Sequence, residues 1–201
     1  MNTISRLEDA IDRVVENEPR SSFRLAPIAD FAIDQFQQLG LSDVRGGSSG
    51  ELRIRGLARA KDWDVAYNFA GKPRLLVSLK SIWANAGGTV PNRIDDLIGE
   101  TANVQQMSPE IVVGYVLLFD VSADSKRRVD NLYWSEFFES AVKKIAIRKA
   151  PLWNQGLIEG TWFIKFDSRS PKGSRIEDPP KVSNEGNTFF SALDSIRKPP
   201  D

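Results

Sequence analysis

Asp64, Ser78 and Lys80 are the residues whose types and spacing are best suited to chemistry in this chain. Asp64 lies in the apolar segment Trp63 to Phe69, whereas Ser78 and Lys80 lie in a second apolar segment that ends at Ile82. A turn that contains Gly and Pro separates the two segments. Carboxylates bind hard cations, and a lysine can orient water and stabilise developing negative charge. The pattern therefore indicates metal-dependent phosphodiester hydrolysis at a β-hairpin.

The composition removes most other kinds of active site. The 201 residues include no histidine and no cysteine, which excludes His-based triads, thiol nucleophiles and Cys/His zinc sites. The 27 basic residues equal the 27 acidic residues in number, so the net charge predicts no general attraction to polyanions. Carboxylate, lysine, hydroxyl and magnesium chemistry remain, and any binding of nucleic acid must depend on local basic patches.

The parity of the hairpin decides whether these side chains meet. Side chains at positions i and i+2 of a strand share a face, so Ser78 and Lys80 project together. Asp62 has the same parity as Asp64, and parity does not distinguish the two. We prefer Asp64 because it lies deeper in the predicted strand.

The loop between the two strands sets their register. A three-residue loop, Ala70 to Lys72, would place Asp64 opposite Ser78. A two-residue turn at Gly71 and Lys72, without a bulge, would place Asp64 opposite Leu79 and break the site. The proposed site therefore requires an odd-length loop or a bulge.

The elements that must position this hairpin can be predicted from periodicity and turn residues. Their order indicates an α/β sandwich in one domain, residues 1–167. The remaining residues, 168–201, are rich in proline and are predicted to form a mostly extended tail, although one apolar island in it has helical spacing. The island comprises Phe189, Phe190, Leu193 and Ile196. The predicted helices are residues 3–16, 27–39, 91–107 and 131–148, and the predicted strands are residues 52–57, 63–69, 74–82, 111–119 and 161–167.

This order of elements, with Asp64 fourteen residues before a Ser78-Leu79-Lys80 triplet, resembles the PD-(D/E)xK nuclease superfamily, particularly type II restriction endonucleases. The segment from Asn92 to Asn103 is similar to the Asn-Arg-x-Glu-Glu-Ala-x-Gly helix of some of those enzymes. The resemblance covers residues 25–120. It implies a restriction-endonuclease-like three-layer sandwich with a central mixed sheet of about five strands. It also implies a DNA endonuclease that uses Mg²⁺, for which Mn²⁺ can substitute. A homodimer would suit the cleavage of both strands of a duplex.

The triplet departs from the family pattern, because Ser78 stands where the family has an acid and one metal ligand is thereby missing. Some restriction enzymes with serine there recruit an acid from the next helix. The resemblance therefore implies a metal site of Asp64 with Asp96 or Glu100, and Asp95 is the third choice. The catalytic set would be completed by Lys80 and Ser78. Two alternatives without catalysis remain. Asp64 and Lys80 could form an ordinary ion pair between the two strands, and Asp96 and Glu100 could lie on a solvated helix face.

Basic residues near the hairpin outnumber the acids beside them and predict a DNA-binding strip. They are Arg53, Arg55, Arg59 and Lys61, and Arg93 at the start of the next helix could bind a phosphate bidentately.

Two other functions remain open. Ser78 motivates the first, a catalytically inactive nuclease-fold module for DNA binding or assembly. The second is an interaction protein of a defence system that docks through the tail and its apolar island. The longest apolar run, Ile111 to Phe119, is too short to span a bilayer, and the amino terminus does not resemble a signal peptide. We therefore expect a cytoplasmic protein with no membrane partner.

Overall fold

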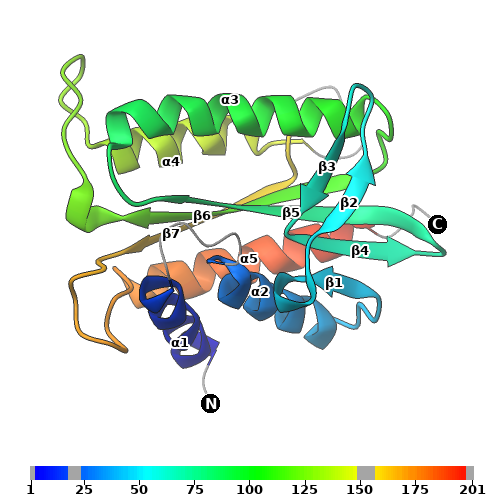
Figure 1. Cartoon of the computed structure of the whole chain (residues 1–201), viewed down its shortest axis with the longest axis horizontal. Helices are drawn as coiled ribbons and strands as arrows, with labels where there is room; N and C mark the ends of the chain where they lie inside the picture. Colours follow the sequence, from blue (N-terminus) through cyan, green and yellow to red (C-terminus); the bar gives the residue numbers. More distant parts are fainter. Residues whose placement is uncertain (1–2, 18–23, 149–156, 198–201) are drawn as a thin grey trace.

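A mixed five-stranded sheet between two layers of helices forms the body of the protein (Figure 1). The computed structural model describes residues 3–17, 24–148 and 157–197, and in the last helix it describes side chains as far as residue 194. The strand order is β1-β4-β5-β6-β7. The strands are β1 (Val44–Gly46), β4 (Val65–Phe69), β5 (Lys72–Ile82), β6 (Val112–Asp120) and β7 (Gly160–Phe166).

The two helical layers each cover one face of the sheet (Figure 1). One layer contains α1 (Thr3–Glu16), α2 (Ala26–Gln38) and α5 (Pro179–Arg197), and the other contains α3 (Ala86–Gln105) and α4 (Trp134–Ile145). Short 3₁₀ turns occur at Gly47–Ser49 and Val121–Ala123. Each layer has its own apolar cluster against the sheet. The predicted α/β three-layer sandwich with a mixed sheet of about five strands is thus confirmed.

Strand β6 lies between two parallel neighbours, β5 and β7, and all nine of its residues are buried. Its uniform apolar sequence follows from this position, because a strand of a parallel sheet with helices on both faces has no solvated side. Strands β1 and β4 pair antiparallel with their neighbours on the other side of β5. The long strand β5 therefore joins the antiparallel and parallel halves of the sheet.

The predicted strand from Trp63 to Phe69 is divided in the structure. Its first residue belongs to β3 (Ala60–Trp63), which pairs with β2 (Leu52–Arg55) in a separate two-stranded sheet. The main sheet begins again at Val65, so Asp64 lies at the break between the two sheets and not deep within a strand. The apolar pattern is continuous across this break and gave no sign of it.

Helix α3 begins earlier than predicted. It starts at Ala86, whereas the sequence indicated a loop up to Thr89 and a helix that begins at Pro91. Pro91 lies in the second turn, where its missing N–H leaves the carbonyl of Gly87 without the usual helical bond. The preference of proline for the first helical position therefore misplaced the start of the helix.

The prediction of a mostly extended tail is wrong. Residues 179–197 form the 19-residue helix α5, which packs against β6 and β7. Contact is close enough that a Cβ added to Gly114 in β6 would lie 2.6 Å from Leu193 Cδ1. Phe189, Phe190 and Leu193 are buried, so they belong to the core and do not form a docking surface. The side chain of Ile196 lies outside the described side chains. Among the described helices, none has the length and apolar content needed to cross a membrane.

Candidate functional site

The hairpin of β4 and β5 has the parity that the site requires, through a bulge. Phe69 pairs with Lys72 across a two-residue loop, Ala70 and Gly71, and both loop residues have positive φ as in a type I′ turn. The register then shifts by one residue at Arg74. The predicted three-residue loop is therefore wrong, but the predicted alternative of a bulge is confirmed and brings Asp64 to Ser78.

Asp64 is held from one side by β5. Its Oδ2 accepts a hydrogen bond from the Leu79 backbone N–H at 2.8 Å and another from Ser78 Oγ at 3.3 Å. Its own carbonyl accepts a hydrogen bond from the Gly47 N–H at 3.0 Å. Burial raises the pKa of Asp64, although the Leu79 N–H and two nearby lysines oppose that shift. Ser78 thus serves to orient the carboxylate.

Glu100 from α3 meets Lys80 from β5 above the sheet. Lys80 Nζ lies 3.0 Å from Glu100 Oε1, and the Tyr115 hydroxyl donates to Glu100 Oε2 at 2.9 Å. Tyr115 is buried in β6 opposite Ser78 in the parallel register. Burial, together with the proximity of Glu100, raises the pKa of Tyr115 well above its ordinary value. The hydroxyl therefore remains a donor, and it fixes the Glu100 carboxylate.

The three acids predicted on this helix have different positions. Glu100 lines the cleft and has only 11% of its side chain exposed. Asp96 pairs instead with Arg93, at 2.9 Å and one turn away, near the surface. Asp95 is exposed. The structure therefore brings Glu100 to Lys80 and leaves the other two acids outside this cluster.

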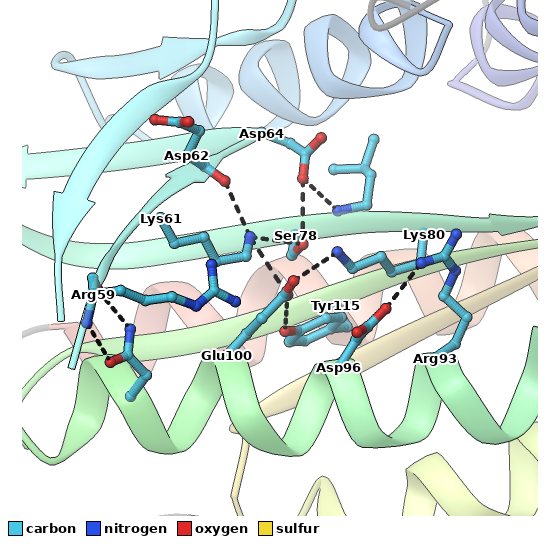
Figure 2. A network of polar contacts seen from close by, with 12 residues as sticks. Arg59, Lys61, Asp62, Asp64, Ser78, Lys80, Arg93, Asp96, Glu100 and Tyr115 are labelled. Atoms are coloured by element: carbon cyan, nitrogen blue, oxygen red, sulfur yellow. Dashed lines mark hydrogen bonds and ion pairs between the residues drawn. The ribbon is translucent and has the colours of Figure 1, made fainter. Parts of the chain in front are cut away.

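Lys61 is the unexpected member of the cluster (Figure 2). The sequence placed it on an exposed basic strip, but its side chain is only 10% exposed and lies inside the cleft. Its Nζ lies 3.5 Å from Ser78 Oγ, 3.1 Å from the Asp62 carbonyl and 3.4 Å from Glu100 Oε2, and it also stacks 4.1 Å above the Trp63 ring. Burial lowers the pKa of Lys61.

The cluster lies in an open cleft of about 700 Å³ between the β2–β3 hairpin, α3 and the end of β5. Three of the predicted DNA-binding arginines, Arg53, Arg59 and Arg93, line this cleft, and Arg55 is exposed outside its lining. Arg53 also pairs with Asp62 at 3.2 Å. Figure 2 shows Arg59 and Arg93 on opposite sides of the Lys80 and Glu100 pair.

Sequence reasoning missed three residues at this cleft. Tyr115 carries the only polar side chain between Val112 and Phe119, and a buried tyrosine usually requires a hydrogen-bond partner, which was a usable signal. Glu51 lines the cleft, where burial and the nearby Asp64 raise its pKa. Arg24 also lines the cleft. Neither Glu51 nor Arg24 has a sequence pattern that points to the site.

The oxygen donors of this cluster fit a hard divalent cation. Proteins commonly hold Mg²⁺ through one or two carboxylates with water completing the shell, and Asp64 and Glu100 supply two. The Lys61 ammonium, with the Asp62 carbonyl, Ser78 Oγ and Glu100 Oε2 within 3.5 Å, already marks a cation position beside Glu100. Within residues 3–17, 24–148 and 157–197, no group of three or more His, Cys, Asp or Glu residues could hold a metal.

Ser78 lies beside a lysine of lowered pKa, which is the arrangement of a serine-lysine nucleophile. Its side chain is completely buried, so a substrate cannot reach it. The groups that do face the cleft are carboxylates, lysines and arginines. These groups carry the functional argument, because no family model, curated protein or solved structure was found to match this chain.

Proposed function

We propose that this protein is a Mg²⁺-dependent DNA endonuclease that hydrolyses phosphodiester bonds, as the resemblance to PD-(D/E)xK nucleases implies. The observation that supports this most is the meeting of Lys80 and Glu100 beside Asp64 in a cleft rimmed by arginines. These residues come from a helix, a strand and a break between sheets. An incidental surface ion pair would not need the buried Tyr115 hydroxyl or the Leu79 N–H to orient its carboxylates.

Each residue has a defined part in this proposal. Asp64 and Glu100 would hold Mg²⁺, which supplies water activation and offsets charge on the leaving oxygen. Lys80 orients the attacking water and stabilises the negative charge that develops on the phosphate. Tyr115 and Ser78 position the two carboxylates.

The arginines of the cleft bind the phosphates of the DNA backbone. The activity would be cytoplasmic, and a two-fold dimer would present two such clefts to the two strands of a duplex.

Incubation of plasmid DNA with Mg²⁺ or Mn²⁺ tests the proposal. We expect discrete fragments from the wild type and none from Lys80→Ala. Lys72→Ala is the matched control, because Lys72 is an exposed lysine of the same strand at the hairpin turn. Full cleavage by Lys80→Ala, or no cleavage of any DNA by the wild type with either metal, would refute the proposal.

A catalytically inactive DNA-binding module is the second candidate, favoured by the Lys61 ammonium in the cation position. In such a module Lys61 would replace the metal permanently, while the arginines would still bind DNA. Calorimetric titration with Mn²⁺ distinguishes the two functions. Binding that is lost in Asp64→Ala supports the enzyme, whereas no binding, or identical binding by the variant, supports the inactive module.

A further inference from the structure

The cleft extends past the catalytic cluster to a stacked arginine, Arg24, that precedes α2. We propose that Arg24 binds a backbone phosphate of the nucleic-acid strand, at a subsite separate from the one where hydrolysis occurs. This inference rests on the proposed function only in its choice of nucleic acid as ligand. The subsite itself is built from side chains that take no part in the Lys80 and Glu100 cluster.

The guanidinium group of Arg24 is held in place by two contacts. Its Cζ lies 3.5 Å from the centroid of the Trp83 ring, which in turn meets Phe166 edge-on at 4.9 Å. Its Nε donates to the Val14 carbonyl at 3.3 Å. These contacts fix the plane of the group, and among the described residues neither of its terminal amino groups has a hydrogen-bond partner. A planar, fixed guanidinium of this kind matches a phosphate bidentately at little entropic cost.

The charge of Arg24 also lacks compensation. Among the described residues, no carboxylate lies within ion-pair distance of it. Asp120 acts on it only at longer range, since Asp120 Oδ1 accepts from the Ser122 and Ser168 N–H groups. Arg24 is half-buried, and burial lowers its pKa. A half-buried cation without an acid would be stabilised by an anionic ligand bound in the cleft.

The location of Arg24 is consistent with a strand of nucleic acid along the cleft. Trp83 follows Lys80 by three residues, a distance of about 10 Å at the rise of a β-strand. One strand of B-DNA carries a phosphate each ~3.4 Å along the helix axis. Arg24, stacked on Trp83, would thus contact a different phosphate from the one that is hydrolysed. Arg59 and Arg93, which lie on opposite sides of the Lys80 and Glu100 pair, line the same cleft (Figure 2).

The test measures binding of a fluorescein-labelled duplex oligonucleotide to the full chain in EDTA, at several salt concentrations. We expect Arg24→Gln to weaken binding about tenfold and to reduce the slope of log K against log salt by about one. Arg24→Lys keeps the charge and should keep the slope, with a smaller loss of affinity. Arg13→Gln is the control, because Arg13 is exposed on α1 outside the cleft lining. Thermal unfolding of each variant verifies that it is folded.

Several outcomes would overturn the subsite. They are an unchanged slope in folded Arg24→Gln, an effect no larger than that of Arg13→Gln, and the absence of oligonucleotide binding by the wild type. Binding of inorganic phosphate that depends on Arg24, without binding of the oligonucleotide, would assign the subsite to free phosphate instead.

The subsite and the proposed function fail separately. Binding in EDTA that depends on Arg24, without cleavage in Mg²⁺ or Mn²⁺, would refute the nuclease and keep the subsite. Cleavage by the wild type with an unchanged slope in Arg24→Gln would refute the subsite and keep the nuclease.

Discussion

Replacement of Lys61 by methionine should tighten the binding of divalent metal ions. The Lys61 ammonium lies 3.4 Å from Glu100 Oε2 and 3.5 Å from Ser78 Oγ, which itself donates to Asp64. It therefore occupies a cation position next to the Glu100 carboxylate. A metal ion held by Asp64 and Glu100 must displace this ammonium group or tolerate its repulsion. Methionine has a similar length and no charge, so it removes the competitor and keeps most of the packing against Trp63.

The size of the gain in metal affinity follows from the exposure of the Lys61 and Glu100 ion pair. Exposed ion pairs contribute about 0–1 kcal/mol, and breaking a fully buried pair costs about 3–5 kcal/mol. The Lys61 and Glu100 side chains are 10% and 11% exposed, but their contact is long and Glu100 keeps Lys80 as a second partner. We therefore place the displacement cost of Lys61 at ~1.4 kcal/mol, which corresponds to a tenfold lower Kd for the metal in Lys61→Met.

Calorimetric titration with Mn²⁺ measures this effect, and Tb³⁺ luminescence excited through Trp63 provides an independent reading at the site. Lys72→Met is the control, since Lys72 is exposed at the hairpin turn. A Kd in folded Lys61→Met that equals or exceeds the wild-type value would show that Lys61 does not compete with the metal. Tighter binding in Lys72→Met of the same size would show a general charge effect instead.

Two further predictions concern the stability of the fold. Leu193→Ala should lower the free energy of unfolding by about 2–5 kcal/mol, because Leu193 packs fully buried on Gly114, whereas the exposed Ser191→Ala should change it little. Urea denaturation measures the free energy of unfolding of both variants. Equal values for Leu193→Ala and Ser191→Ala would show that the packing of α5 contributes little to the stability of the fold. Burial raises the pKa of Glu159 from 4.5 to about 7, so its carboxyl ionises first in the unfolded chain. The free energy of unfolding should then fall as pH rises from 4.5 to about 7, by at most about 3 kcal/mol, and this fall should be absent in Glu159→Gln.

The sequence predicted those elements whose pattern does not depend on distant parts of the chain. Helix α1 is amphipathic along its whole length, and β6 is apolar on both faces, so each pattern has one structural solution. The break at Asp64 was hidden because Trp63 and Val65 are both buried, although in different sheets. The sequence did not predict helix α5, because prolines stand at its start and follow its end. The helical spacing of its apolar island was the correct signal.

The candidate site was predictable as far as strand parity reaches. Asp64, Ser78 and Lys80 share a face because side chains alternate along a strand. The choice of Glu100 over Asp96 depends on the position of α3 over the sheet, which the sequence does not contain. The entry of Lys61 into the cleft depends on how the β2–β3 hairpin folds over β5, a contact between two separate sheets.

The bulge at Arg74 sets the register that brings Asp64 to Ser78. The site therefore depends on whether the number of residues between them changes by an odd or an even number. One residue more or fewer between Asp64 and Ser78 would exchange the two faces of β5, presenting Leu79 to the cleft and turning Lys80 towards the opposite apolar layer. Changes of two residues would restore the original faces and only move the turn outwards or inwards. Natural variation here should therefore occur in even steps. Distant relatives of this chain would be recognised by the parity of that spacing and not by its length.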